Sequence, residues 1–385
     1  MGAIMKMRLN LTAGTGFVLA GSCLFAGSVW PADANKQSQY AVVYQINPAH
    51  SGGITFSAGF ATPLTKAWSE NLGSSLSYPV IAGGRVFVNS SGGVTYALNL
   101  ATGATDWSKN MGTSLGPAYD QGSLFVVTGG GLLSGLSARS GKTQWSVQLP
   151  YQYAFSSPPM AVKGEVFTGG AGSGGNVYGV DELTGNLLWT QQVANGDDSS
   201  PAYGNDGIYV SYPCQYYKFD PASGTVDWHY NGGCDGGGGN TPAYYSGRVY
   251  IQDWTSGNYV MDARDGTILG TFGANNGDPP AFYQLTTGKK LGFSLYNGQL
   301  YGWKVSSGTN VWNFSGDGQL STPPIAVNGL VIEGSGSGNV YALDAASGTQ
   351  QWTDNTGAGV TALAAGQDML VVISGSIVTA YAPTQ

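Results

Sequence analysis

The sequence is poor in charge and in histidine, and each scarcity excludes a class of chemistry. Only 10% of the 385 residues are charged, with 15 Lys and Arg against 22 Asp and Glu, a formal net charge of −7. Nucleic acids and anionic membrane surfaces attract clustered Lys and Arg, so this balance argues against both as partners. The two histidines, His50 and His229, lie far apart and lack metal-ligand spacing, which leaves little material for a zinc site or for Ser-His-Asp catalysis.

Stretches with helical periodicity are scarce as well, whereas glycine and aromatic residues are abundant. The chain contains 62 Gly, 23 Tyr and 10 Trp, and 42% of its residues are hydrophobic. Short apolar runs separated by Gly-rich turns are typical of β-strands, and there is enough apolar material for a large core. The composition therefore predicts an all-β protein.

The first residues show the three parts of a secretory signal peptide. Lys6 and Arg8 precede the mostly apolar stretch Leu9 to Trp30, and Ala32-Asp33-Ala34 forms a cleavage signal. No later segment reaches about 18 apolar residues, so we expect no transmembrane span after processing. We predict a signal peptide over residues 1–34, an N-terminal segment over 35–59 and a repeat domain over 60–385.

The signal peptide and the three cysteines indicate in which cellular compartment the protein functions. The signal peptide predicts a periplasmic or secreted protein; lipid anchoring at Cys23 is the less favoured alternative, because Ala20 stands where such anchors usually carry Leu. Cys214 and Cys234 remain after cleavage. An even pair of cysteines in an oxidising compartment predicts one disulfide.

A unit of roughly 40 residues recurs along nearly the whole processed chain. It ends in Ala-x-Asp-x-x-Ser/Thr-Gly-x-x-x-Trp, and the clearest copies are ALNLATGATDW (97–107) and ALDAASGTQQW (342–352). Successive Trp positions are 38 to 44 residues apart, with Gly270 in the place of one Trp. We predict that Trp303 or Phe272 fills the space that this Trp leaves. We predict that the repeated tryptophans pack between units: Trp68, Trp107, Trp145, Trp189, Trp228, Trp312 and Trp352.

Each unit contains four short strand-like runs, which is the content of one antiparallel β-propeller blade. A blade has two apolar faces that only its neighbours can cover, so the blades must close into a ring. The C-terminal stretch supplies only three strands. We therefore predict that Leu64 to Asn71 pairs with Ile377 to Ala382 and completes an eighth four-stranded blade from both ends of the chain.

The two clearest copies resemble the pyrroloquinoline-quinone (PQQ)-like repeat, shared by quinoprotein dehydrogenases and by the outer-membrane assembly lipoprotein BamB. The resemblance covers roughly residues 60–382 and implies the propeller fold. The resemblance to BamB implies an exported scaffold that binds a protein or ligand. The resemblance to the dehydrogenases implies bound PQQ with calcium, an aspartate base and a disulfide between adjacent cysteines. Because no adjacent cysteines occur, we favour a scaffold with no catalytic residue, cofactor or metal, and keep a PQQ-dependent dehydrogenase as the alternative.

Aromatic residues gather in loops that a propeller places on one face. The loop leading into the innermost strand and the loop between the second and third strands emerge at the same end of a blade. In the third, fourth and fifth blades these loops carry Tyr151, Tyr153, Phe155, Tyr212, Tyr216 and Trp254. If these rings are exposed, they predict a binding surface for another envelope or secreted protein, and this surface would lie beside a Cys214–Cys234 bridge. The alternative is that several of the rings pack inward. We expect a monomer.

Overall fold

The computed structural model describes residues 39–57, 59–172, 174–196, 199–234, 239–253, 257–273 and 277–384. Residue contacts divide the chain into residues 1–33 and 34–385, and every described residue belongs to the second unit. The predicted signal peptide, the candidate lipidation site Cys23 and the candidate binding residue Trp254 lie outside the described residues. Within the described ranges, no helix is long and apolar enough to span a membrane.

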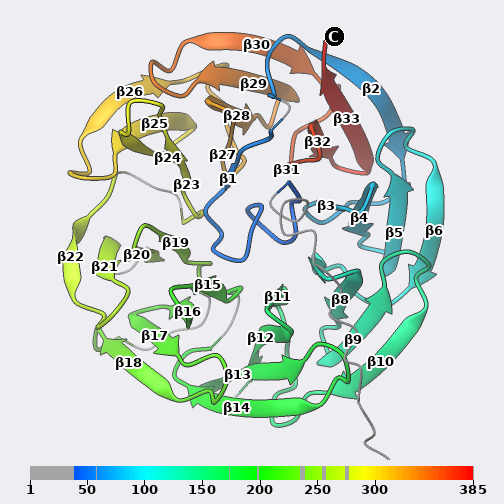
Figure 1. Cartoon of the computed structure of the whole chain (residues 1–385), viewed down its shortest axis with the longest axis vertical. Helices are drawn as coiled ribbons and strands as arrows, with labels where there is room; N and C mark the ends of the chain where they lie inside the picture. Colours follow the sequence, from blue (N-terminus) through cyan, green and yellow to red (C-terminus); the bar gives the residue numbers. More distant parts are fainter. Residues whose placement is uncertain are drawn as a thin grey trace, which may run out of the picture. The chain divides into compact units, whose positions relative to one another are not determined.

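Eight sheets form a ring, each with four antiparallel strands and one with a short fifth strand, which confirms the predicted eight-bladed β-propeller (Figure 1). Blade 1 comprises β3 (Val80–Ala82), β4 (Arg85–Asn89), β5 (Val94–Asn99) and β6 (Thr105–Asn110). Blade 2 comprises β7 (Ala118–Asp120), β8 (Ser123–Val127), β9 (Leu132–Ser137) and β10 (Thr143–Gln148). Blade 3 comprises β11 (Met160–Val162), β12 (Glu165–Gly172), β13 (Gly174–Asp181) and β14 (Leu187–Val193). Blade 4 comprises β15 (Ala202–Gly204), β16 (Gly207–Tyr212), β17 (Gln215–Phe219) and β18 (Val226–Asn231).

The second half of the ring repeats this order from the innermost strand outward. Blade 5 comprises β19 (Ala243–Tyr245), β20 (Arg248–Asp253), β21 (Gly257–Asp262) and β22 (Ile268–Thr271). Blade 6 comprises β23 (Ala281–Gln284), β24 (Lys290–Tyr296), β25 (Gln299–Lys304) and β26 (Asn310–Phe314). Blade 7 comprises β27 (Ile325–Val327), β28 (Leu330–Gly334), β29 (Asn339–Asp344) and β30 (Gln350–Asn355), with β1 (Gly53–Ile54) added in parallel to β27. Blade 8 comprises β31 (Ala362–Gly366), β32 (Met369–Ser374), β33 (Ile377–Pro383) and β2 (Leu64–Asn71).

The core lies between the blades. In β4 of blade 1, Val86, Phe87 and Val88 are all buried, because each face of this strand meets a neighbouring blade. In the outermost strand β6 no residue is fully buried, and exposed residues alternate with half-buried ones from Asp106 onward. A strand near the axis has both faces covered and therefore consists of consecutive apolar residues. A strand at the rim has one covered face, so its buried and exposed residues alternate.

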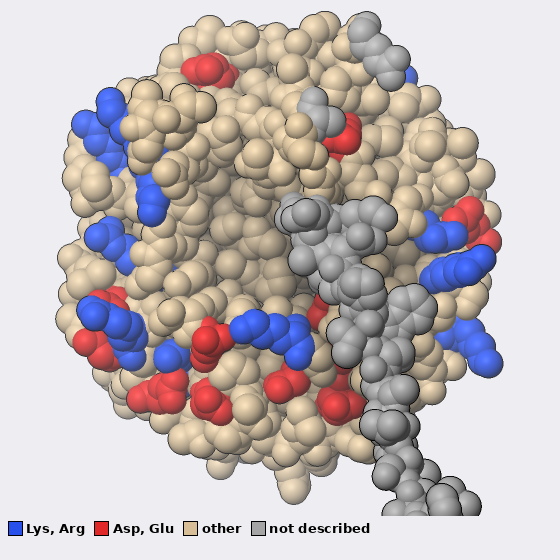
Figure 2. Space-filling view, viewed as in Figure 1, with Lys and Arg blue, Asp and Glu red and all other residues tan. Residues whose placement is uncertain are grey.

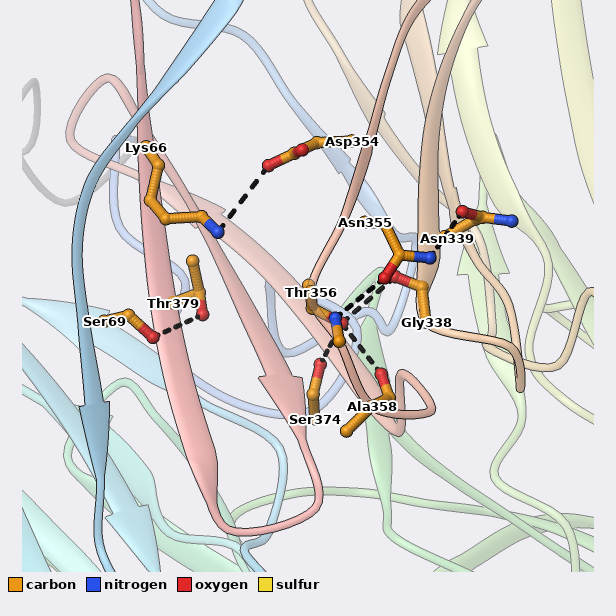
Figure 3. A network of polar contacts seen from close by, with 11 residues as sticks. Lys66, Ser69, Gly338, Asn339, Asp354, Asn355, Thr356, Ala358, Ser374 and Thr379 are labelled. Atoms are coloured by element: carbon orange, nitrogen blue, oxygen red, sulfur yellow. Dashed lines mark hydrogen bonds and ion pairs between the residues drawn. The ribbon is translucent and has the colours of Figure 1, made fainter.

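The ring closes through both chain ends. Strand β2 pairs antiparallel with β33, from Leu64 opposite Pro383 to Asn71 opposite Ile377, which confirms the predicted closure. The hydroxyl oxygens of Ser69 and Thr379 lie 3.1 Å apart across this pair (Figure 3). Lys66 Nζ lies 3.9 Å from an oxygen of Asp354 in blade 7. The N-terminal strand is thus bound to its own blade and to the preceding one.

The repeated tryptophans connect successive blades. Trp107 of blade 1 donates its indole N–H to the carbonyl oxygen of Ala138 in blade 2 at 3.0 Å, and a Cβ added to Gly141 would lie 2.7 Å from its ring. Five other indoles donate in the same way, over 2.6 to 3.3 Å: Trp68 to Leu100, Trp145 to Glu182, Trp189 to Pro221, Trp228 to Ala263 and Trp312 to Ala345. Trp352 packs instead against Tyr381, with ring centroids 5.3 Å apart. The glycine of the turn is required because any side chain there would displace the indole.

Residues 39–56 occupy the inside of the ring, a position that no sequence pattern indicated (Figure 1). Ala41 forms two backbone hydrogen bonds with Ile81 of blade 1, at 3.0 and 2.7 Å. Backbone hydrogen bonds join the rest of the segment to six more blades: Gln39 to Gln367, Val42 to Tyr119, Pro48 to Tyr203, Ala49 to Tyr244, Ser51 to Phe282 and Gly52 to Ala326. The segment thus bridges the innermost parts of seven blades.

Candidate functional site

The two ends of the ring carry different connections between strands. We call the end with the loops between blades, and between the second and third strands of a blade, the loop face. We call the opposite end, with the turns that follow the first and third strands, the turn face. Most partners of the N-terminal segment, among them Ile81, are residues of the innermost strands, and Gln367 lies in the turn that follows β31. The predicted aromatic surface belongs to the loop face.

Tyr151 and Tyr153 are the most exposed aromatic residues described, at 77% and 76%. They lie on the segment that joins blades 2 and 3. Gln152 between them donates through Nε2 to Oδ1 of Asn176 at 2.6 Å. Backbone hydrogen bonds attach the following residues to both blades: Ala154 with Ala171 in blade 3 and Phe155 with Gly129 beside blade 2. The two rings therefore project into solvent from a segment whose backbone is held on both sides.

Three other candidate residues are buried, so for them the alternative of inward packing holds and they do not contribute to an exposed surface. Phe155 is 4% exposed and packs against Tyr178, with ring centroids 5.8 Å apart. A Cβ on Gly131 or on Gly170 would collide with the Phe155 ring. These two glycines make room for the ring between blades 2 and 3, and burying it removes a large apolar area from water.

Tyr212 and Tyr216 are also part of the core of blade 4. They are 1% and 0% exposed, and Tyr216 stacks on Tyr230 with ring centroids 5.1 Å apart. Strands β16 and β17, which contain them, are buried along their whole length because both faces are covered by neighbouring blades. A Tyr in such a strand contributes packing rather than contact surface.

The Cys214–Cys234 disulfide is present, as predicted, and joins two loops of the loop face. Asn195, in the segment that leaves blade 3, donates through Nδ2 to the carbonyl oxygens of Pro213 and Cys234, both at 3.3 Å. A bridge that closes a loop of this length stabilises a fold by about 3 kcal/mol in the chain-entropy model. The disulfide therefore holds the loops of blade 4 beside the segment that leaves blade 3.

Both histidines are engaged in structural contacts. His229 stacks on Tyr217, with ring centroids 4.0 Å apart, and its Nε2 lies 2.7 Å from Oε1 of Gln215. The two ring nitrogens of His50 lie 2.7 and 2.9 Å from the carbonyl oxygens of Tyr44 and Pro201. Burial lowers the pKa of both imidazoles. His50 thus anchors the N-terminal segment, and His229 supports the disulfide-bearing loops.

Two buried acidic side chains of the ring belong to neighbouring blades. The described residues contain no group of three or more His, Cys, Asp or Glu side chains arranged to hold a metal. Asp278 and Glu333 interact at the loop-face end of blades 6 and 7, and burial raises the pKa of both carboxyl groups. Glu333 accepts a hydrogen bond from the Thr322 hydroxyl at 3.0 Å. Calcium takes six or more oxygen ligands, so these two carboxyl groups would supply only part of such a site.

Comparisons with known proteins agree with the repeat and the ring. A family model described as outer membrane protein assembly factor BamB matches residues 8–200, 173–284 and 284–385. The solved structure of BamB from Moraxella catarrhalis is 18% identical, with a TM-score of 0.68 over 83% of this chain and 100% of that one. No curated protein sequence matches.

Enzymes share the same fold. A europium-containing methanol dehydrogenase is 17% identical, with a TM-score of 0.73 over 88% of this chain and 90% of that one. The quinohemoprotein alcohol dehydrogenase of Comamonas testosteroni is 16% identical, with a TM-score of 0.74 over 92% of this chain and 82% of that one. Identities this low establish the propeller fold alone, because unrelated functions are built on one scaffold.

Proposed function

From the premise that the chain belongs to the family of the outer membrane protein assembly factor BamB, we propose that it is a protein-binding scaffold of the cell envelope. In this proposal the signal peptide directs the chain to the periplasm or out of the cell, and Tyr151 and Tyr153 contribute the centre of the binding surface. The main observation behind this proposal is that the rings of Tyr151 and Tyr153 are exposed on a segment whose backbone is hydrogen-bonded to blades 2 and 3.

Several properties of the loop face support this assignment. Exposed Tyr residues provide large contact area at a small loss of conformational freedom, and they are enriched at the centres of protein interfaces. Leu132, which begins β9 in the neighbouring blade 2, is a further exposed apolar residue of the loop face, at 39%. The backbone hydrogen bonds of Ala154 and Phe155 lower the cost of ordering this surface when a partner binds.

Capture from envelope extract tests the proposal. The tagged, processed chain is expected to retain a partner, and the double variant Tyr151→Ser with Tyr153→Ser is expected to lose it, because the contact area disappears while the fold stays. Leu183→Ser is the matched control: Leu183 is 81% exposed in blade 3, which the tyrosine segment enters, but lies on the turn face. Equal capture by the double variant, or equal loss in the control, would contradict the assignment.

The dehydrogenase alternative has a separate test. Purified protein is incubated with PQQ and calcium, and the absorbance spectrum and dye-linked alcohol oxidation are recorded. If the protein is a scaffold, the PQQ absorbance spectrum and the rate of dye reduction are expected to be the same as in buffer without protein. A quinone spectrum that stays with the protein after desalting, together with dye reduction, would favour the enzyme.

A further inference from the structure

The interface between blades 5 and 6 lacks the tryptophan that connects other neighbouring blades. Gly270 stands in its place, and all four residues of β22 are exposed. Trp303 of blade 6 fills part of the space, as predicted from the sequence: it is 1% exposed, and its ring centroid lies 5.5 Å from that of Phe272. A cavity of about 320 Å³ nevertheless remains between β22 and blade 6, with Leu269, Phe272 and Trp303 among its walls.

Arg248 makes the hydrogen bond that the missing indole would make. Its Nη1 donates to the carbonyl oxygen of Val305 at 3.1 Å. Val305 is the residue directly after β25, the third strand of blade 6. Ala345 holds the same position after β29 in blade 7, where its carbonyl oxygen accepts the indole N–H of Trp312. The guanidinium group therefore lies at the edge of the vacant indole position.

The charge of Arg248 is not neutralised in the way that the equivalent charge is in blade 1. Arg85 is the first residue of β4, and Arg248 is the first residue of the equivalent strand β20. The Nε atom of Arg85 lies 2.7 Å from a carboxylate oxygen of Asp106, the residue before Trp107. In blade 5 the residue before Gly270 is Leu269, which has no charge. Asp262, opposite Arg248 in β21, forms its ion pair with Arg264 at 2.7 Å. Among the described residues, Arg248 takes part in no ion pair.

A second cavity continues from Arg248 along the turn face. It measures about 550 Å³ and shares Arg248, Val305 and Ser306 with the first. Its remaining lining residues are Ser246, Gly288, Lys289, Lys290 and Lys304, so four of its eight lining residues are cationic and none is acidic. Figure 2 shows Lys and Arg side chains gathered over blades 5 and 6 at the upper left, whereas blue and red groups alternate along the lower part of the ring. The groove is thus basic in a chain with a net charge of −7.

We propose that the joined cavities between blades 5 and 6, which we call the blade 5–6 groove, bind a small anionic ligand that carries an aromatic group. The negative group lies against Arg248 and the lysines, and the ring enters the space beside Gly270. Leu269, which is 49% exposed, and the small exposed edges of Phe272 and Trp303 provide its apolar wall. The two cavities together have the size of a small-molecule site. A carboxylate or phosphate is the partner that a guanidinium with adjacent ammonium groups recognises. The groove lies on the turn face, so this proposal does not depend on the proposed function.

Isothermal titration calorimetry with three probes tests the chemistry. Indole-3-propionate joins an indole to a carboxylate, indole-3-propionamide lacks the charge, and inorganic phosphate lacks the ring. We expect the first probe to bind at least about tenfold more tightly than either of the others, because each lacks one of the two contacts. Phosphate binding as tightly as indole-3-propionate would overturn the aromatic part of the proposal, and absence of binding by the propionate would overturn it entirely.

Variants place the ligand in the groove. Arg248→Gln and Lys304→Gln are each expected to weaken indole-3-propionate binding about tenfold, whereas Lys142→Gln, at an exposed lysine of a turn in blade 2, should leave it unchanged. Gly270→Trp fills the cavity and should abolish binding. Because the φ of 154° at Gly270 favours glycine, Leu269→Asp provides a second test: its carboxylate competes for Arg248 and should also weaken binding. Equal weakening by Lys142→Gln and Lys304→Gln would show diffuse charge attraction and overturn the site.

Discussion

The interface between blades 1 and 2 and the interface between blades 5 and 6 have the same strand geometry but are filled differently. In the first, Trp107 covers Gly141 and the preceding Asp106 neutralises Arg85. In the second, Gly270 and Leu269 occupy the two positions, and a Cβ added to Gly308 would meet the Thr271 carbonyl oxygen at 3.1 Å instead of an indole. A single Asp-Trp pair thus combines packing with charge neutralisation. Its loss leaves a cavity and an arginine that forms no ion pair with the residues that the structure describes.

The largest expected effect comes from removing the indole of the complete interface. Trp107→Ala should lower the free energy of unfolding by about 3–5 kcal/mol, because the ring volume is lost and the Ala138 carbonyl loses its donor. Leu269→Ala at the other interface is the control and should change it by less than about 0.5 kcal/mol, since Leu269 is 49% exposed. Urea denaturation measures both. If Trp107→Ala is no more destabilising than Leu269→Ala, the indole does not hold the blades together.

A smaller, pH-dependent effect is expected between blades 2 and 3. The position that carries Val305 in blade 6 carries Glu182 in blade 3, where burial and the neighbouring Asp120 raise the pKa of the Glu182 carboxyl to about 8. Between its ordinary value of 4.5 and about 8, the folded chain holds a proton that the unfolded chain releases, so stability falls as pH rises through this window.

Glu182→Gln should remove this dependence. The variant is expected to be more stable than wild type at pH 8, by on the order of 2 kcal/mol, and to match it at about pH 3, where the wild-type carboxyl holds its proton in both the folded and the unfolded state. Urea denaturation at the two pH values measures the difference. A gain of equal size at both values would show that Gln improves packing and that the charge of Glu182 plays no part.

The smallest expected effect comes from restoring the missing ion pair. Leu269→Asp places a carboxylate where blade 1 has Asp106, and pairing with the half-buried Arg248 should raise stability by about 0.3–1 kcal/mol at low salt. Leu269→Asn is the matched control because it has the same shape without the charge. An equal gain from the Asn variant, or a gain that persists in high salt, would show that the ion pair is not its source.

The predictable part of the molecule is the part that repeats. The Trp spacing predicted the blades, and the shortage of one strand at the C-terminus predicted the pairing of β2 with β33. The absence of a Trp at Gly270 predicted that Trp303 or Phe272 would fill the space, and Trp303 fills part of it beside Phe272. The candidate surface was less predictable: Tyr151 and Phe155 occupy one loop, yet the first is 77% and the second 4% exposed. Alternation alone does not distinguish them, because the ring of Phe155 turns inward only where Gly131 and Gly170 leave room.

The sequence by itself determined the blade number, the closing strand and the disulfide, because each depends on a local pattern or on a count of strands and cysteines. Only the tertiary structure decided where residues 39–56 lie, which aromatic rings face solvent, and that two cavities meet at Arg248. These features depend on pairs far apart in the chain, such as Gln39 with Gln367 and Arg248 with Val305. Such pairs form only when the ring closes and brings separate blades into contact, so no repeat of roughly 40 residues contains the information that specifies them.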